Sequence, residues 1–279
     1  MHMSPPNISI GGIQLKAVEL FKYLGSIVSN DASADAEITA RIAQATSAFG
    51  RLTKRLWKNR NIRLDTKISV YRASVVTSLL FGCEAWTLKK AHIARLERFH
   101  QSCLRRIAKI KWQYYVTNYE VLADCGITSI QCMVEGAVLR WTGHVVRMSN
   151  DRIPKRVLYG RLVKGRSSGG NQVTYLNQAK RILRGCDIDP GNLETLAASR
   201  VDWRKRYKDG TALAEATRIE DLKAARWNGS WSKTTVCYCA THPLSNSGML
   251  DLGQRLCTTL VQSCSAASPG PPILAASYP

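Results

Sequence analysis

Acidic residues are scarce in this sequence, which has 20 Asp and Glu against 40 Lys and Arg, a net charge of +20 and a pI near 9.9. A compact chain with so much charge of one sign repels itself unless a polyanion neutralises it. Long apolar runs are also missing. The uncharged stretch between Arg72 and Glu84 is too short to span a bilayer, and Pro, Ser and Gln interrupt the uncharged C-terminal run. We therefore expect a polyanionic partner and no membrane partner.

Two further features concern the cellular compartment. The opening residues, MHMSPPNISIGG, lack the charged-then-apolar order of a signal peptide. The nine cysteines are scattered and odd in number, which is typical of reduced thiols and not of a disulfide framework. We expect an intracellular protein, in the nucleus, the cytoplasm or both. Hydrophobic residues form 45% of the chain, enough for a buried core over most of its length.

The positive charge is concentrated in one part of the chain. Residues 41–115 carry 17 Lys and Arg against three acids, a net charge of +14, whereas residues 1–40 carry a net charge of −2. A solubilising surface mixes both signs, so a block of one sign indicates a binding face. The alternative is a solvated basic surface without a partner.

The first 33 residues have the pattern of short strands. Ile8 and Ile10, then Ile13 and Leu15, alternate around a Gly-Gly pair at residues 11–12, which predicts a tight hairpin. A further run, FKYLGSIV at residues 21–28, predicts one more strand. The pattern then breaks at Asn30, Asp31 and Ser33, where a helix is expected to begin.

Three amphipathic helices follow, with apolar residues every three or four positions. We predict them at residues 37–58, 65–82 and 92–110, with Asp65 as the N-cap of the second. Their basic residues lie mainly on other faces, so each helix can pack inward and present cations outward. The predicted fold is mainly α: short N-terminal strands, then a basic helical bundle and further helices.

The rest of the chain predicts more helices and two breaks. Helices are expected at residues 117–124, 129–148, 154–162, 173–185 and 192–226. The Gly/Ser-rich run at 165–172 is the candidate linker, and the Pro/Ser-rich end predicts a disordered tail. The expected segments are therefore 1–33, 34–115, 116–164, 165–172, 173–230 and 231–279.

The order of several sequence blocks resembles one family. The blocks are FKYLGSIVS, ARIAQATSAFGRL, TKISVYRASVVTSLLFGCEAWTL, LRRIAKIKW, LRWTGHVVRM and RIPKRVLYGRL, followed by GRSSGGNQVTYLNQAKRIL and LAASRVDWRKRY. Together they cover roughly residues 6 to 228 and resemble the C-terminal portion of non-LTR (LINE-type) retrotransposon reverse transcriptases. The resemblance implies that residues 1–33 are the last strands of the palm, that 34–115 are the thumb, and that the rest is a C-terminal extension.

The catalytic carboxylates of that family have no counterpart here. Family members hold two metal ions with a Tyr/Phe-x-Asp-Asp turn upstream of the FKYLG block, because Mg²⁺ must neutralise charge on the transferred phosphate. This sequence contains no Asp-Asp pair; its adjacent acids, Glu220 and Asp221, lie far downstream. We therefore expect no polymerase or endonuclease activity from this chain as it stands, no cofactor of its own, and Mg²⁺ only together with a palm from elsewhere.

The resemblance implies a grip on RNA, DNA or an RNA–DNA hybrid through the phosphate backbone, which Lys and Arg neutralise without a sequence code. A separate palm-containing chain is a further possible partner. Two alternatives stay open: a stand-alone nucleic-acid-binding or scaffolding protein derived from such an element, and a pseudogene product without a selected role. The candidate contact residues are Tyr23, Leu24, Gly25, Lys54, Arg55, Lys58, Arg60, Arg95, Arg98, Arg105, Arg106 and Lys109.

Other candidate sites favour structural roles. The C-terminal Cys/His cluster has zinc-ligand residue types, but its spacing matches no common finger; its members are Cys237, Cys239, His242, Cys257 and Cys264. His100 and Cys103 fall on an apolar helical stripe, which predicts core packing. A structural hydrogen bond is expected for His144. Trp57, Trp112 and Tyr114 stand beside basic residues and could stack on bases, but we expect them to anchor the bundle.

Overall fold

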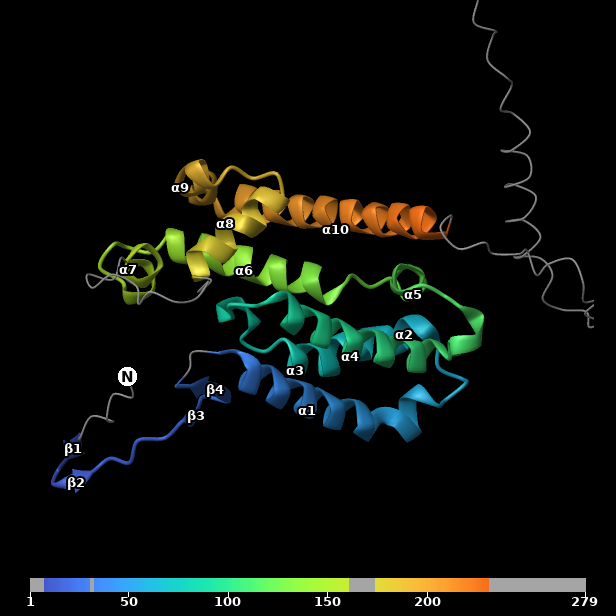
Figure 1. Ribbon diagram of the computed structural model, residues 1–279, viewed down its shortest axis with the longest axis horizontal. Helices are drawn as coiled ribbons and strands as arrows, with labels where there is room; N and C mark the ends of the chain where they lie inside the picture. The colour runs from blue at the N-terminus through green and yellow to red at the C-terminus, as the bar shows by residue number, and fades with distance from the viewer. Residues whose placement is uncertain (1–7, 31–32, 161–173, 231–279) are drawn as a thin grey trace, which may run out of the picture. The chain divides into compact units, whose positions relative to one another are not determined.

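A computed structural model describes residues 8–30, 33–160 and 174–230. Helices dominate these ranges, and two small antiparallel strand pairs precede them (Figure 1). The predicted fold class is confirmed. The predicted linker at 165–172 and the tail at 231–279 lie outside the described residues. The chain as far as Arg226 forms one compact unit, and a second unit begins at Trp227.

The N-terminal strands form two separate hairpins. Strands β1 (Ser9–Ile10) and β2 (Ile13–Gln14) pair around the two glycines, as predicted. The run predicted as one strand at 21–28 is instead a second hairpin, β3 (Leu20–Tyr23) with β4 (Ser26–Ser29). Its turn residues Leu24 and Gly25 both have positive φ, 47° and 86°, the left-handed conformation that two-residue hairpin turns require. Leucine is unusual at such a position, so the run carries no familiar turn signal.

The helical elements follow in chain order. They are α1 (Asp35–Leu52), α2 (Leu64–Val70), α3 (Thr77–Leu79), α4 (Lys90–Ala108), α5 (Asn118–Asp124), α6 (Ile130–Val146), α7 (Ile153–Tyr159), α8 (Tyr175–Gly185), α9 (Leu193–Ala198) and α10 (Arg200–Ser230). Two π-helical segments, Thr53–Trp57 and Tyr71–Val76, extend α1 and join α2 to α3. The single helix predicted at 192–226 is wrong, because the chain is extended at Ser199 between α9 and α10.

The three predicted bundle helices bury the faces that their periodicity indicated. In α1 the buried apolar residues include Ile38, Ala45 and Phe49, and the helix from α2 to α3 buries Ile68, Tyr71, Val75 and Leu79. The acidic residues Asp35 and Glu37 occupy the first turn of α1, where the helix dipole favours negative charge. The prediction for Asp65 is wrong: α2 begins at Leu64, so Asp65 lies inside the first turn and Arg63 takes the N-cap position without a side-chain hydrogen bond.

Hydroxyl side chains cap the N-termini of three of the later helices. Thr117 and Glu120 form a reciprocal capping box at α5, in which the Thr117 N–H donates to Glu120 Oε2 over 2.6 Å. Ser129 Oγ accepts a hydrogen bond from the Cys132 N–H at the start of α6, and Thr174 Oγ1 accepts one from the Asn177 N–H at α8. These caps satisfy backbone donors that the first helical turn leaves unpaired.

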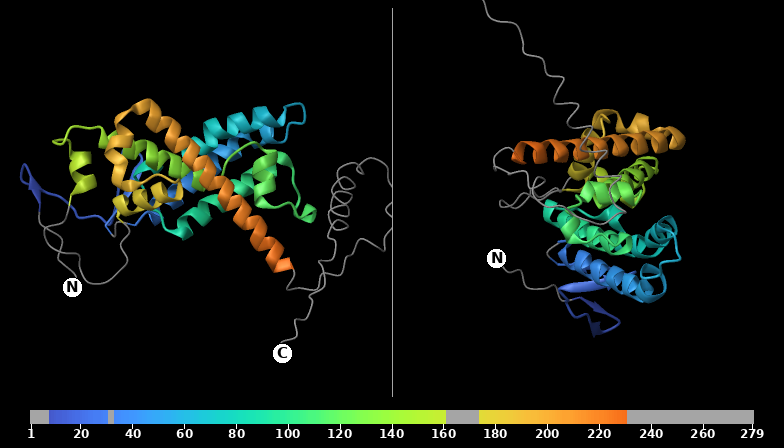
Figure 2. Two further views of the ribbon diagram at one scale, coloured as in Figure 1. Left: turned by 90° about the horizontal axis from the view of Figure 1, so that it is seen from above. Right: turned by 90° about the vertical axis from the view of Figure 1, so that its right-hand side faces the viewer.

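Helix α6 lies at the centre of the packing. It packs against α4 on one side and against α8 and α9 on another, while α4 also packs against α1 (Figures 1 and 2). Helix α10 runs along α6 and is tied to it by Trp203, whose Nε1–H donates to the Leu139 carbonyl over 3.1 Å. Near the other end of the contact, the Ser129 N–H donates to Glu215 Oε1 over 3.0 Å. The later helices therefore form one core with the basic bundle.

Acid should destabilise this core through His100. The ring is buried, and its Nδ1 lies 2.9 Å from the Tyr71 hydroxyl. Burial lowers the pKa of His100 to about 4 from 6.5; a hydrogen bond of the ring to the Thr128 backbone opposes the shift, and the charge of Arg72 adds to it. Because the unfolded chain takes up this proton first, the free energy of unfolding should fall as pH falls from about 6.5 towards 4, by about 2 kcal/mol between about pH 7 and 4.5.

Urea unfolding of the parent chain and of His100→Gln, at about pH 7 and at about pH 4.5, measures how much His100 contributes to the pH dependence of stability. The Gln variant should lose about 2 kcal/mol less than the parent over the same pH interval, since it has no ring to protonate. His144→Gln is the matched control because His144 is exposed. Equal pH dependence in the parent and in His100→Gln would contradict the prediction.

Candidate nucleic-acid interface

Cations from three elements meet at one end of the helical bundle. The Lys67 side chain of α2 is buried, and its Nζ donates to the Asn59 carbonyl over 2.6 Å, in the loop that follows α1. Burial, with the nearby positive charge of Lys109 at the C-terminal end of α4, lowers the pKa of Lys67. The end of α1, the start of α2 and the end of α4 are therefore neighbours here. We call this region the basic end: residues 54–60, Lys67 and residues 106–111.

The predicted contact residues after α1 belong to the basic end. Lys58 and Arg60 flank Asn59 in the loop that holds Lys67, and both are exposed. Lys54 and Arg55 lie one turn earlier, in the π-helical segment, and are exposed as well. All four cations predicted in this stretch thus lie close to one another on the surface.

The predicted cations of α4 divide into two groups. Arg98, Arg106 and Lys109 are exposed, and no described residue forms an ion pair with them. Arg95 instead binds α1: its guanidinium lies 3.3 Å from Asp35 Oδ1 and donates to Thr39 Oγ1 over 2.8 Å.

Arg105 is also used inside the protein. Its Nη2 donates to the Val116 carbonyl over 2.8 Å and to Asn118 Oδ1 over 2.9 Å. Arg95 and Arg105 therefore hold neighbouring segments in place. The side chains of Arg98, Arg106 and Lys109 are exposed to solvent. Periodicity put all five cations mainly on faces other than the apolar one but could not tell these roles apart.

Tyr23, Leu24 and Gly25 lie away from the basic end. The Gly25 carbonyl accepts a hydrogen bond from Arg41 Nη2 over 2.7 Å, which fixes the turn near the start of α1. Lys58 follows the other end of the same helix. At a rise of about 1.5 Å per residue, the 17 residues between Arg41 and Lys58 place the turn about 25 Å from the basic end. A single bound molecule would have to be extended to contact both the Tyr23–Gly25 turn and the basic end.

The predicted structural role of the aromatic residues is confirmed for one of three. Trp57 is buried, stacks on Phe49 with ring centroids 5.1 Å apart, and donates from Nε1 to the Phe49 carbonyl. The same prediction is wrong for Trp112 and Tyr114, which are 75% and 56% exposed. Tyr115, which no sequence pattern singled out, adjoins them and is 77% exposed.

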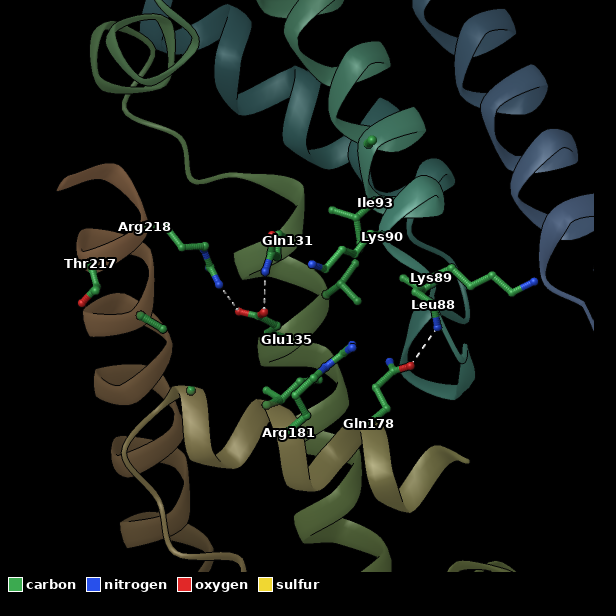
Figure 3. Close-up of a pocket in the computed structure, with 15 residues that line it drawn as sticks. Leu88, Lys89, Lys90, Ile93, Gln131, Glu135, Gln178, Arg181, Thr217 and Arg218 are labelled. Carbon is green, nitrogen blue, oxygen red and sulfur yellow. Dashed lines mark hydrogen bonds and ion pairs between the residues drawn. The ribbon is translucent and has the colours of Figure 1, made fainter. Parts of the chain in front are cut away.

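A separate cavity of about 680 Å³ lies between α4, α6, α8 and α10 (Figure 3). Its lining residues include the apolar Ile93 and Ile182 and the cations Lys90 and Arg181. One wall carries an ion pair between Arg218 Nη1 and Glu135 Oε2, 2.8 Å apart. The candidate contact residues do not line this cavity.

Thiols and imidazoles of the described chain belong mainly to the core. Cys103 and His100 are buried side by side on α4, as predicted, and burial raises the pKa of the Cys103 thiol to about 12. Among residues 8–30, 33–160 and 174–230, no group of three His, Cys, Asp or Glu side chains is placed to hold a metal ion. The predicted Cys/His cluster at 237–264 lies outside the described residues. Exposed His144 lies beside Trp141, with ring centroids 5.4 Å apart, and no hydrogen bond of its side chain is found within the described ranges.

In the part of the chain that the structure describes, no helix combines the length and the apolar character needed to cross a membrane. Comparison of the chain with protein-family models, curated proteins and solved structures yields no match.

Proposed function

We propose that this chain grips nucleic acid through its phosphate backbone, with the basic end as the main contact. The observation that carries this proposal is the convergence of exposed cations around Lys67 and Lys109, where burial and then the charge of Lys109 lower the pKa of Lys67. Such convergence is unfavourable in the free protein and becomes favourable when a polyanion neutralises it. Phosphates are the chemistry that Lys and Arg recognise without reading a sequence.

The role we propose is that of the non-catalytic C-terminal part of a non-LTR reverse transcriptase, which would hold the template–primer. Support comes from the ordered sequence blocks and from a basic helical bundle that directly follows short strands. In this proposal Mg²⁺ and the paired carboxylates belong to a palm that these residues do not supply.

The N-terminal hairpins favour association with such a palm. Ile10, Ile13, Phe21 and Leu24 are all more than half exposed on strand pairs of only two strands each. Two-stranded sheets are marginal in water and present unpaired edges, so they gain stability when another sheet or chain covers them. We propose that a palm-containing chain would pack there.

Removing the exposed cations of α4 should weaken binding and reduce its salt dependence. We expect the parent chain to bind single strands and duplexes with little sequence preference. With about five phosphate contacts, binding should weaken about a hundredfold or more between about 50 and 200 mM salt. The variant Arg98→Gln, Arg106→Gln, Lys109→Gln should lower affinity, and the slope of log affinity against log salt should fall by roughly 0.7 to 0.9 for each phosphate that the variant no longer neutralises. Fluorescence anisotropy with a labelled oligonucleotide measures both quantities.

A matched variant removes the same charge from another surface. Arg204, Lys205 and Lys208 are exposed on α10, so their change to Gln also lowers the net charge by three. This control should keep the parent's salt slope. The free energy of unfolding shows whether weaker binding comes from lost contacts or from loss of folded structure. Lys109→Gln should not destabilise the protein, because it removes positive charge beside Lys67. If the α4 variant binds with the parent's affinity and slope, the exposed cations of α4 do not form part of the grip.

A further inference from the structure

Three exposed aromatic side chains follow directly on the basic end. Trp112, Tyr114 and Tyr115 lie within four consecutive residues, and each is more than half exposed. Large rings are usually buried or half-buried, so three of them together on a surface indicate a binding site. From Arg98 to Tyr119 the sequence holds five Lys and Arg and no acidic residue. The rings therefore follow a purely basic stretch, and the next charged residue after them is Glu120.

The segment that carries these rings has a defined conformation. A short 3₁₀ turn, Trp112–Tyr114, is closed by the Tyr114 N–H to the Lys111 carbonyl and by the Tyr115 N–H to the Trp112 carbonyl, each over 3.2 Å. Beyond the turn, Arg105 holds Val116 and Asn118 against α4. Both ends of the segment are thus fixed while its rings remain in solvent.

The backbone of this segment is strained at two positions. Lys109 and Tyr115 have φ angles of 58° and 50°, a left-handed conformation that is uncommon for residues with long side chains. Such strain persists when the surrounding structure enforces it, most often at functional sites. Here the left-handed residues stand before the first ring and at the third.

We propose that Trp112, Tyr114 and Tyr115 form a stacking platform for unpaired bases, so that the chain prefers single-stranded nucleic acid to duplexes. This inference rests on the proposed function and names the form of nucleic acid bound. Bases within a duplex already stack on each other, whereas the bases of a single strand can stack on protein rings while nearby cations bind the phosphates. Lys109, Lys111 and Arg106 supply those cations beside the platform.

The test compares two variants on two ligands by fluorescence anisotropy at constant salt. The ligands are a labelled oligothymidine and a labelled duplex of equal length. Trp112→Ala, Tyr114→Ala, Tyr115→Ala together should weaken single-strand binding on the order of a hundredfold, because each ring–base stack is worth about 1–3 kcal/mol, or about five- to 150-fold. Duplex binding should change less than about threefold, and the slope against log salt should stay the same, since every cation is kept.

Further measurements separate stacking from loss of structure. The variant with Phe at all three positions keeps the ring faces and should retain single-strand affinity within about threefold. Trp227→Ala removes another exposed tryptophan and should have no effect. An oligonucleotide of equal length with abasic sites keeps its phosphates but offers no bases, so the parent chain should bind it as weakly as the Ala variant does.

The outcomes also distinguish this proposal from the phosphate grip. Unchanged single-strand affinity in the Ala variant, with salt-sensitive binding intact, would overturn the platform and leave the grip in place; the rings would then belong to a protein interface. A parallel loss of duplex binding in the Ala variant would also overturn the platform. Absence of any salt-sensitive binding by the parent chain would overturn both proposals.

Discussion

Gly143→Ala should release α10 from α6 and lower the free energy of unfolding by about 3 kcal/mol or more. A Cβ at Gly143 would lie 2.0 Å from Nε1 and 2.5 Å from Cδ1 of Trp203, far inside van der Waals contact. The indole cannot yield without losing its hydrogen bond to Leu139 and its place in the core, where it is almost fully buried. Loss of a buried tryptophan from a core costs about 3–5 kcal/mol.

The same helix provides the control for this prediction. Apart from its chain neighbours and the nearby backbone of its own helix, Gly136 has no described atom within 4 Å of the position that a Cβ would take, so Gly136→Ala should be neutral or stabilising by up to about 1 kcal/mol. Urea unfolding gives the free energies. Hydrogen exchange should show that amides of α10 lose protection in Gly143→Ala while those of α1 and α4 keep theirs. Equal stability of the two variants would show that Trp203 can move at little cost.

Periodicity predicted the helices that bury one side. Ile38, Ala45 and Phe49 recur at helical spacing because α1 has a single face toward the core, and the structure buries that face. The two glycines at 11–12 likewise predicted the first hairpin, since glycine adopts positive φ without strain. These helices and this hairpin depend on residues close together in the chain, so they can be predicted from the sequence alone.

Features that depend on distant residues escaped prediction. The turn at Leu24–Gly25 is held by Arg41 from α1, an interaction that no local turn signal announces. The roles of the cations on α4 depend on which neighbour approaches each one, so Arg95 and Arg98 looked equivalent in the sequence. Trp112 and Tyr115 are exposed, and Arg105 holds the segment that follows them against α4, a contact between residues 11 positions apart. A run of aromatics directly after several cations was the available signal.

Arg41→Met should lower the free energy of unfolding by about 3–5 kcal/mol, because it leaves the buried Glu37 carboxylate without its partner. Both side chains are about 4% exposed, and Arg41 Nε lies 2.7 Å from Glu37 Oε1. The pair also joins the second hairpin to α1: Arg41 donates to the Gly25 carbonyl, and the Ile27 N–H donates to Glu37 Oε2 over 2.5 Å. Urea unfolding measures the destabilisation, and faster exchange of the Ile27 amide should accompany it.

A double-mutant cycle tests whether the pair acts as a unit. Glu37→Leu with Arg41→Met removes both charges, so it should cost clearly less than the sum of the two single changes, with a coupling of about 1–3 kcal/mol. Arg63→Met is the matched control, because Arg63 pairs with Asp65 on the surface, where both side chains are exposed, and this change should cost less than about 1 kcal/mol. If Arg41→Met cost no more than Arg63→Met, or if the two single changes simply added, the hairpin would not depend on a buried ion pair. A large coupling would instead show that the pair fixes the Tyr23–Gly25 turn at the start of α1, about 25 Å from the basic end.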